Sequence, residues 1–423
     1  MSEAIMPFGR PVYVMLKPVG ARCNLRCDYC YYLGRGLHEG AVMSEALLEE
    51  FIRQYLEAQT VPQVLFTWHG GEPLLRGIDF YRKALELQRK YGKGRQIDNC
   101  LQTNGTLLND EWCRFFHDNH FLIGISIDGT QAMHDGHRGD SSRNGEGTGF
   151  RGRSWYEVMR GIGLLKRYGV EWNAMATVNA ANVGSPVGFY RFFRQIGCEF
   201  LQFTPVVEVS RRCDVSWRNE DSPKCEMSDE SITAEEWGRF LCAVYDEWVR
   251  EDVGRVFVQL FDATLANWCG VAPGVCSMAP TCGQAAVMEA DGSVYSCDHF
   301  VSPAYRLGNI RQQEAGGRQS TLVSGQQPTL SSLLYSERQQ QFGQSKFTSL
   351  PQQCRECRWL FACNGECPKN RIAVDCYGNP GLNWLCGGYR QFFSHVAADM
   401  DFMKSEIDAG RAPANIMRAN LKK

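Results

Sequence analysis

The sequence predicts an α/β protein that begins with six β/α units and continues into a cysteine-rich C-terminal region. The first part of this prediction rests on strand-like and helix-like patterns that alternate about six times in the first half of the chain. The second part rests on cysteines that crowd together from about residue 270 onward. A chain of 423 residues is too long for one ordinary core. We therefore expect two or three domains, or one barrel with additions.

The six predicted strands are short segments rich in apolar residues, separated by helical patterns. They span residues 11–19, 63–70, 97–105, 121–129, 170–179 and 198–207. Residues 44–59 repeat apolar side chains at helical spacing, and Ser154 and Gly169 mark the N-cap and the end of another helix. Six such units form an incomplete barrel or an open sheet. Both arrangements place their sites at the C-terminal ends of the strands.

The second half of the chain is less regular. Residues 208–232 are polar and predict a linker, residues 233–252 predict a helix, and a last helix is expected from about Tyr389. The Gly-, Gln- and Ser-rich residues 311–332 predict a mobile surface loop. The expected domains are a barrel, a linker with connecting helices, a cysteine-rich domain, and a C-terminal helix with its tail. Their predicted boundaries are 1–207, 208–270, 271–390 and 391–423.

Composition excludes several classes of protein. A net charge of −2 gives no reason to expect binding to nucleic acid or to an anionic membrane surface. The N-terminus has no long apolar segment, and no apolar run reaches the length of about 18 residues that a membrane span needs, so we expect a cytoplasmic protein without a membrane span. The chain has nineteen cysteines, which is an odd number, and it lacks an export signal. Both observations argue against a disulfide scaffold and favour metal binding.

The first cysteine motif lies in the stretch "GARCNLRCDYCYYLGR", in the loop after the first predicted strand. Cys23, Cys27 and Cys30 have the spacing C-x3-C-x2-C. Four thiolates would saturate a [4Fe–4S] cluster, whereas three leave one iron open to a substrate. The alternatives are a zinc knuckle or three unrelated thiols, although this spacing is uncommon for zinc.

This motif resembles that of the radical S-adenosylmethionine (SAM) superfamily, in which the open iron binds SAM and reduction releases a 5′-deoxyadenosyl radical. "WHGGEPLL" at the end of the second predicted strand resembles the family's GGEP motif. The resemblance implies a partial (β/α)6 barrel and a set of residues that contact SAM. These are Tyr29, Gly71, Ser126, Arg138 and Val207. Alternatively, Tyr29 only shields a cluster from water, and Arg138 is a solvated loop charge.

The C-terminal cysteines divide into two sets of four. The Asp291–Gly292 pair predicts a hairpin, which would bring Cys282 and Cys297 together. The ending Cys363-x3-Cys367-Pro repeats that of two-cluster ferredoxins, in which the last cysteine binds the other cluster. The predicted sets are Cys276, Cys282, Cys297 and Cys367, and Cys354, Cys357, Cys363 and Cys386.

This crossed assignment resembles the SPASM extension of radical SAM peptide-modifying enzymes. It implies two auxiliary iron–sulfur clusters, and hence three [4Fe–4S] clusters in all. The alternative is two structural zinc sites. The remaining eight cysteines are expected to be core or incidental thiols.

The chain resembles the anaerobic sulfatase-maturating enzymes nearly from end to end, in "KPVGARCNLRCDYCYY", "LFTWHGGEP", "CDHFVSP" and "FACNGECPKN". This implies oxidation of a cysteine or serine of a sulfatase polypeptide to Cα-formylglycine. Asp298, directly after Cys297, would accept the proton, an auxiliary cluster would accept the electron, and a flavodoxin- or ferredoxin-type protein would donate electrons. Alternatively, Asp298 only supports the cluster or ends the hairpin with a hydrogen bond.

Two other functions remain open from the sequence. One is a radical SAM/SPASM maturase that cross-links another ribosomal peptide, and the other is a zinc-rich protein-interaction module. The insertion at 311–332 and the glycine-rich 139–153 segment depart from the family pattern and leave substrate contacts open. The sequence does not decide between cysteine and serine as the target.

Overall fold

Six parallel strands form the wall of the barrel. The computed structural model describes residues 12–32, 40–139, 154–209, 226–311 and 328–420. The strands are β1 (Tyr13–Leu16), β2 (Gln63–Trp68), β3 (Gln96–Thr103), β4 (Phe121–Ser126), β5 (Trp172–Val178) and β6 (Phe200–Pro205). They pair in parallel in chain order, so their C-terminal ends meet at one edge. The predicted strands are therefore confirmed, with β3 beginning one residue early.

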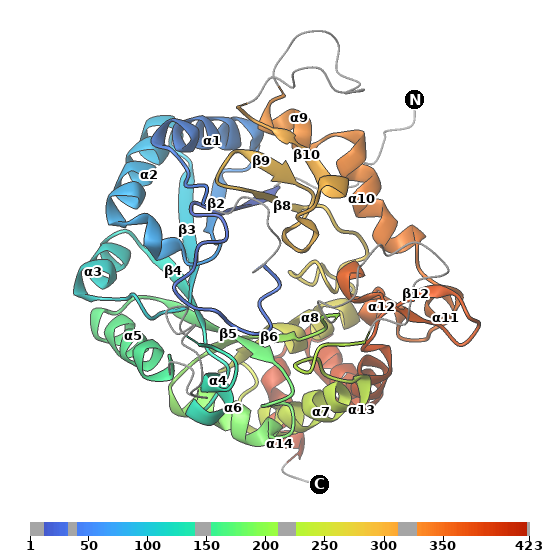
Figure 1. The fold of residues 1–423 in the computed structure, drawn as a ribbon. Coiled ribbons are helices and arrows are strands. Elements are labelled where there is room, and N and C mark those ends of the chain that lie inside the picture. Colours follow the sequence, from blue (N-terminus) through green and yellow to red (C-terminus); the bar gives the residue numbers. More distant parts are fainter. Residues whose placement is uncertain (1–11, 33–39, 140–153, 210–225, 312–327, 421–423) are drawn as a thin grey trace.

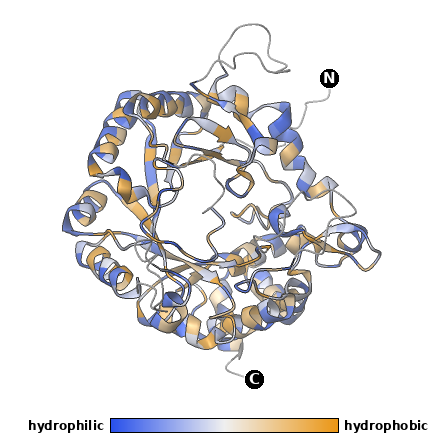
Figure 2. Ribbon diagram, viewed as in Figure 1, coloured by the Kyte–Doolittle hydropathy of each residue, from blue (hydrophilic) through white to orange (hydrophobic). Residues whose placement is uncertain are grey.

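Helices surround this wall on its outer side, as Figure 1 shows. They are α1 (Glu45–Ala58), α2 (Ile78–Tyr91), α3 (Asp110–Asp118), α4 (Gln131–Asp135), α5 (Trp155–Tyr168) and α6 (Pro186–Gln195). Hydrophobic and hydrophilic residues alternate around these helices in Figure 2, and hydrophobic residues recur along the strands. This pattern is typical of helices that bury one face against a sheet.

The predicted capping residues stand at the ends of their helices, but one of them, Ser154, makes no capping hydrogen bond. The Ser44 side chain accepts a hydrogen bond from the Leu47 amide at the start of α1, and Gly169 ends α5 in the left-handed conformation with φ of 63°. Ser154 precedes α5 as predicted, but its hydroxyl does not cap the helix. That hydroxyl instead donates to the carbonyl oxygen of Arg138, which ties α5 to the segment that follows β4.

The sheet continues beyond the barrel on the other side of β1. Strand β8 (Ala285–Met288) pairs in parallel with β1, and β9 (Ser293–Tyr295) and β10 (Arg306–Asn309) follow it in antiparallel pairs. The β8–β9 turn is the predicted hairpin, with Gly292 at φ of 89°. The sequence did not predict its attachment to β1, which makes one sheet of ten strands when β7 (Phe257–Val258) is included.

The helix that carries Cys386 packs against α7 (Ala234–Glu251). This helix, α13 (Cys386–Asp408), begins at Cys386, three residues before the predicted Tyr389. The two helices cross at Gly388, where a Cβ atom would lie 2.2 Å from the carbonyl oxygen of Ala234. Glycine is required at this crossing because the backbones are nearly in contact.

The remaining helices and strands of the described residues are mostly short. They are α8 (Gln259–Trp268), α9 (Leu330–Leu334), α10 (Glu337–Thr348), α11 (Gln352–Arg355), α12 (Leu360–Cys363), α14 (Ile416–Asn420), β11 (Ala373–Val374) and β12 (Pro380–Leu382). Most of the glycine-rich 139–153 segment, of the predicted 311–332 loop and of the predicted 208–232 linker lies outside the described residues. Among the helices of the described residues, none is both long and apolar enough to span a bilayer.

Candidate functional site

A cavity of about 320 Å³ lies where the strands of the barrel end. Residues from the loop after β1, from the ends of β2 to β6 and from the segment after β9 line it. The predicted site residues that it brings together are Cys23, Cys27, Tyr29, Cys30, Gly71, Ser126, Arg138 and Asp298. Among the described lining residues there is no fourth cysteine. Val206 lines the cavity, whereas Val207 is buried behind it, and the carbonyl oxygen of Val207 accepts a hydrogen bond from Lys369 at 2.9 Å.

The loop that carries the first three cysteines rests on the Gly-Gly segment after β2. The Gly71 amide donates to the carbonyl oxygen of Gly20 at 2.8 Å, and the Glu72 amide donates to that of Arg22 at 2.8 Å. A Cβ atom at Gly71 would lie only 2.0 Å from the Arg22 carbonyl oxygen. Gly71 is therefore required for this close backbone contact, in addition to the role that the sequence predicted for it.

The thiols of this loop are placed as metal ligands would be. Cys23 interacts electrostatically with Cys27 and Cys30, and burial raises the pKa of Cys23 to about 12 and that of Cys27 to about 11. The Cys23 sulfur accepts hydrogen bonds from the Leu25 amide at 3.3 Å and from Asn104 at 3.7 Å. Buried sulfurs that accept N–H groups suit thiolates bound to a cation, because a bound metal ion offsets the cost of burying the charge.

Glu72 joins the ends of two neighbouring strands beneath this loop. Its carboxylate is fully buried and accepts hydrogen bonds from the Leu74 amide, the Thr103 hydroxyl and the Asn104 amide, at 2.8 to 3.0 Å. Burial raises the pKa of Glu72 to about 7, although these donors lower it. The carboxylate therefore fixes the position of Asn104 beside Cys23.

Asp128 holds two of the predicted SAM-contacting side chains in place. Arg138 donates to both Asp128 oxygens, at 2.8 and 3.1 Å, and the Tyr29 hydroxyl donates to the same carboxylate. The Thr177 amide donates to it from β5 at 2.9 Å. Burial raises the pKa of Asp128, but Arg138, His134 and Tyr29 together lower it below its usual value, and the carboxylate remains ionised. Arg138 is only 7% exposed, which excludes a solvated loop charge.

Ser126 faces the same cavity from the end of β4. Its hydroxyl accepts a hydrogen bond from Gln102 at 3.0 Å, and both side chains line the cavity. Gln102 comes from β3, so the two neighbouring strands present adjacent polar groups at the edge where a ligand would bind.

Asp298 lies on the opposite wall of the cavity, in a 3-10 turn directly after Cys297. Its carboxylate forms an ion pair with Lys17 and accepts a hydrogen bond from the Tyr31 hydroxyl. Lys17 follows β1 directly, is fully buried, and lies 3.7 Å from the Glu289 carboxylate and 3.4 Å from the centre of the Tyr32 ring. The attachment of β8 to β1 therefore brings Asp298 to the cysteine loop.

The charges around Asp298 favour its ionised form. Burial raises the pKa of Asp298, but the nearby charges of Lys17, His69 and His299 together lower it well below the usual range. His69 lines the cavity at the end of β2, and its Nδ1 accepts a hydrogen bond from the Gly70 amide at 2.8 Å. An ionised carboxylate at the cavity wall is a group that can accept a proton.

Within each of the two predicted C-terminal sets, thiols lie close enough to interact electrostatically. Electrostatic interactions that raise the thiol pKa link Cys297 and Cys367 to Cys276, and link Cys282 to Cys276. In the other set they link Cys363 to Cys386 and Cys354, and link Cys386 to Cys357. Burial contributes most to the raised pKa of Cys297, Cys367, Cys282, Cys363 and Cys386, and it favours the neutral form of these thiols when no metal ion is bound.

A left-handed turn between Cys363 and Cys367 directs these two side chains to different sets. Asn364, Gly365 and Glu366 have φ values of 49°, 69° and 51°. A Cβ atom at Gly365 would lie 2.3 Å from a Leu350 methyl group, so the turn depends on glycine.

The spacing of the cysteines argues against single zinc ions. Four thiolates around one zinc lie about 3.8 Å apart, from the Zn–S distance of about 2.3 Å and tetrahedral geometry. Within the described part of the chain, only Asp28, His137 and Glu230 place three ligand atoms of Cys, His, Asp or Glu within 4.8 Å of one another. In neither set, therefore, do three sulfurs lie within 4.8 Å of one another, as they would around a single zinc ion.

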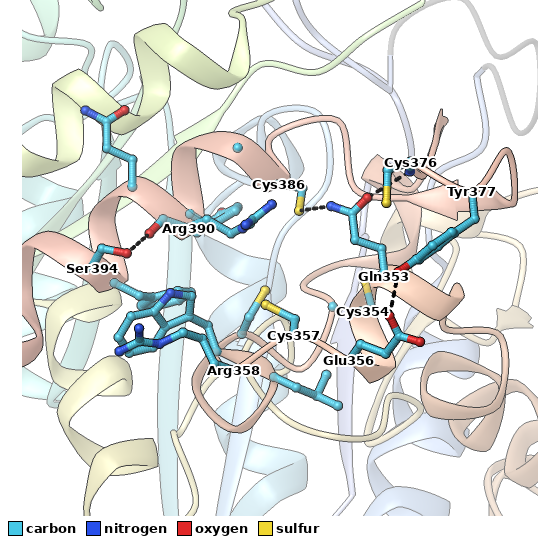
Figure 3. Close-up of a pocket in the computed structure, with 18 residues that line it drawn as sticks. Gln353, Cys354, Glu356, Cys357, Arg358, Cys376, Tyr377, Cys386, Arg390 and Ser394 are labelled. Carbon is cyan, nitrogen blue, oxygen red and sulfur yellow. Dashed lines mark hydrogen bonds between the residues drawn. The ribbon is translucent and has the colours of Figure 1, made fainter.

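Figure 3 shows the residues that line the cavity at the second set. Cys354, Cys357, Cys363 and Cys386 line a cavity of about 790 Å³ together with Arg358 and Arg390. Gln353 donates to the Cys386 sulfur at 3.9 Å. Cys376, one of the thiols predicted to be incidental, also lines this cavity.

The sequence alone did not identify several residues of the site, namely Lys17, Tyr31, Tyr32, His69, Glu72, Asp128 and Glu289. Lys17, His69 and Asp128 follow strand ends, so their position was a usable signal. Glu289 gave no such signal, because its contact with Lys17 depends on the pairing of β8 with β1.

Comparisons with known proteins agree with this architecture. Residues 18–192 match the model of the radical SAM superfamily. The chain is 54% identical, over 98% of its length and 96% of the relative's, to a serine-type anaerobic sulfatase-maturating enzyme of Bacteroides thetaiotaomicron. It is 30% identical, over 91% of its length and 96% of the relative's, to a cysteine-type anaerobic sulfatase-maturating enzyme of Clostridium perfringens.

Solved structures give the same picture. The structure of native anSMEcpe with bound AdoMet and the Cp18Cys peptide matches with a TM-score of 0.77 at 29% identity, and covers 94% of this chain and 100% of that one. SuiB of Streptococcus suis matches with a TM-score of 0.55 at 12% identity, over 89% of this chain and 77% of that one, which indicates a shared fold.

Proposed function

Because the chain belongs to the anaerobic sulfatase-maturating enzymes, we propose that Asp298 and the three-cysteine loop act on one target residue held between them. The enzyme is a radical SAM oxidoreductase that binds SAM and an iron–sulfur cluster and converts a cysteine or serine of a sulfatase to formylglycine. The observation that carries the proposal is that Asp298 and the three cysteines line the same cavity.

Cys23, Cys27 and Cys30 would hold the cluster that binds SAM. When bound, this cluster and SAM supply the 5′-deoxyadenosyl radical, which removes a hydrogen atom from Cβ of the target. Arg138 and Tyr29, both fixed by Asp128, and Ser126, next to Gln102, are placed to orient SAM. Gly71 positions the cysteine loop, and Val207 would contribute through its backbone.

Asp298 would take the proton from the hydroxyl or thiol of the target as the carbon–oxygen or carbon–sulfur double bond forms. The ion pair with Lys17 and the Tyr31 hydrogen bond hold its carboxylate ionised and oriented. A thioaldehyde formed from cysteine hydrolyses to the aldehyde, so both targets lead to formylglycine.

The two C-terminal cysteine sets would hold two further [4Fe–4S] clusters, making three in all. Cys276, Cys282, Cys297 and Cys367 lie on the side of Asp298, so this set would hold the acceptor of the electron that the target loses. This choice of electron acceptor is supported by the sequence, in which Cys297 directly precedes Asp298.

The external one-electron partner, of flavodoxin or ferredoxin type, would approach the second set. Cys354, Cys357 and Cys386 line a cavity that opens to the surface, beside Arg358 and Arg390. The two arginines would attract an acidic electron carrier, and this attraction would weaken at high salt.

We propose serine as the preferred target, because identity to the serine-type relative is 54% and to the cysteine-type relative 30%. The test uses two sulfatase-motif peptides that differ only in serine or cysteine at the target position. Each is incubated anaerobically with reduced enzyme and SAM, and the products are identified by mass spectrometry. Aldehyde from neither peptide would contradict the proposed function, and aldehyde only from the cysteine peptide would contradict the target preference.

A further inference from the structure

A buried lysine cation lies beside the first C-terminal cysteine set. Lys346, on α10, is fully buried, and its ammonium group donates hydrogen bonds to the carbonyl oxygens of Cys276, Ser277 and Ala279. The first two of these bonds are 2.7 Å long. The lysine therefore caps the turn that presents Cys276, although sequence analysis gave Lys346 no role.

The hydrogen bonds fix the charge of Lys346. Three carbonyl oxygens accept from one nitrogen, and a carbonyl oxygen cannot donate in return. Only the protonated amine has three N–H groups, since the neutral amine has two. Lys346 also interacts electrostatically with Cys282, Cys276 and Cys367 of this set and with the buried Glu366. The cation is thus held close to three of the four thiols of its set.

We infer that Lys346 raises the reduction potential of the cluster held by Cys276, Cys282, Cys297 and Cys367. This inference rests on the proposed assignment of cluster ligands. Reduction adds one electron to the cluster without forming or breaking a bond, and the added negative charge is costly in a buried site. A fixed ammonium group in the same site offsets that cost and makes acceptance of the electron from the oxidised target more favourable.

The second cysteine set has a different electrostatic environment. The cations that interact with it are Arg371, which is half-buried, and Arg390, which is exposed. Water screens an exposed charge far more than a buried one. Arg371 also interacts with Cys282, and Glu366 with Cys363 and Cys367, so both charges lie between the sets and act on each. Of the three cations Lys346, Arg371 and Arg390, Lys346 is fully buried and the other two are not.

The test compares Lys346→Met with Lys346→Arg in the full-length, anaerobically reconstituted enzyme. The midpoint potentials of the clusters are measured by redox titration monitored by electron paramagnetic resonance. The signal of the first set is identified as the one missing from a Cys276→Ala/Cys282→Ala variant. Lys90→Met, at an exposed lysine of α2, is the matched control.

In Lys346→Met we expect the ratio of reduced to oxidised first-set cluster at a fixed potential to fall at least tenfold, about 59 mV for one electron. Lys346→Arg and Lys90→Met should leave this ratio near that of the wild type, and the other clusters should not change. If Lys346→Met loses iron, Lys346→Gln replaces it, because glutamine offers two N–H donors without the charge.

An unchanged first-set potential in the uncharged variant would overturn the inference. An equal shift in all clusters would also overturn it, because it would indicate a general change of structure. Iron content is measured first. About four irons per wild-type chain would refute the three-cluster proposal itself, and this failure is distinguishable from an unchanged potential in a protein with about twelve irons.

Discussion

Asp298→Asn removes the proposed proton acceptor while it preserves the shape of the side chain. The carboxylate lines the cavity, pairs with Lys17 and accepts a hydrogen bond from Tyr31. An amide can still accept from Tyr31, but it takes no proton near neutral pH. Loss of a general base costs a factor of about 10² to 10⁴ in rate. This factor corresponds to about 3–5 kcal/mol in the barrier.

The same substitution leaves the buried ammonium of Lys17 without one partner. Breaking a buried ion pair costs about 3–5 kcal/mol of unfolding free energy when the remaining charge is uncompensated. Here Glu289 remains 3.7 Å from Lys17 and is itself fully buried, so a second carboxylate compensates the charge. We therefore expect a smaller loss of stability and a folded variant that keeps its iron.

The assay measures 5′-deoxyadenosine and formylglycine in one reaction. The variant should cleave SAM close to the wild-type rate, because the residues proposed to contact SAM and the three-cysteine loop are unchanged, while formylglycine falls at least about 100-fold. Asp79→Asn, an exposed aspartate of α2, is the matched control and should change neither product. Equal losses of both products would indicate a structural role for Asp298, and normal formylglycine would remove it from the mechanism.

Three further predictions concern metal content, packing and pH. Alanine at all three cysteines of the first motif should abolish SAM cleavage and lower the iron content from about twelve to about eight per chain. The control variant Cys376→Ser should leave the iron content unchanged. Continued SAM cleavage in the triple variant would refute the role of the motif in binding the SAM cluster. Gly71→Ala should destabilise the cysteine loop, because its Cβ atom would overlap the Arg22 carbonyl group. The control Gly163→Ala should be tolerated, because there is open space around Gly163. Equal iron content and equal melting temperature in the two variants would contradict the prediction. Burial raises the pKa of Glu72 from 4.5 to about 7, so the folded state binds this proton more tightly than the unfolded state does. The unfolding free energy should therefore fall by up to about 3 kcal/mol as the pH rises from about 4.5 to 7. Anaerobic denaturant titrations should show that Glu72→Gln lacks this fall, and identical pH profiles for the variant and the wild type would refute the prediction.

The barrel was predictable because its signals are local. Each strand is a short apolar segment followed by a turn, and the helices between them repeat apolar residues with the helical period. The hairpin was also predictable, since Asp291–Gly292 needs only its own neighbours to form a turn. The lack of a side-chain cap at Ser154 was not predictable, because its hydroxyl donates to the carbonyl oxygen of Arg138 after β4, which no local pattern reveals.

In the site, residue types with strong chemical signatures were predictable and their partners were not. The hairpin and the ferredoxin-type ending at Cys363 and Cys367 grouped the cysteines, and the electrostatic interactions between thiols agree with that grouping. The roles of Asp128, Lys17 and Lys346 could not be predicted from a sequence motif. Their ion pairs, and the hydrogen bonds of Lys346 to backbone carbonyl groups, form only when segments distant in the sequence come together. Val206 lines the cavity and Val207 does not, so the predicted contact of Val207 with SAM would come from its backbone and stays a prediction.

The pairing of β1 with β8 has a consequence for biosynthesis. Strand β1 leaves the ribosome before its partner at Ala285–Met288, which follows some 270 residues later. Until then one edge of β1 is unpaired and the wall bearing Asp298 is missing. The cavity at the three-cysteine loop is therefore completed only when β8 pairs with β1. A chimaera that exchanges the C-terminal region between two relatives should exchange β1 and Lys17 as well, because Lys17 pairs with Glu289 and Asp298 of that region.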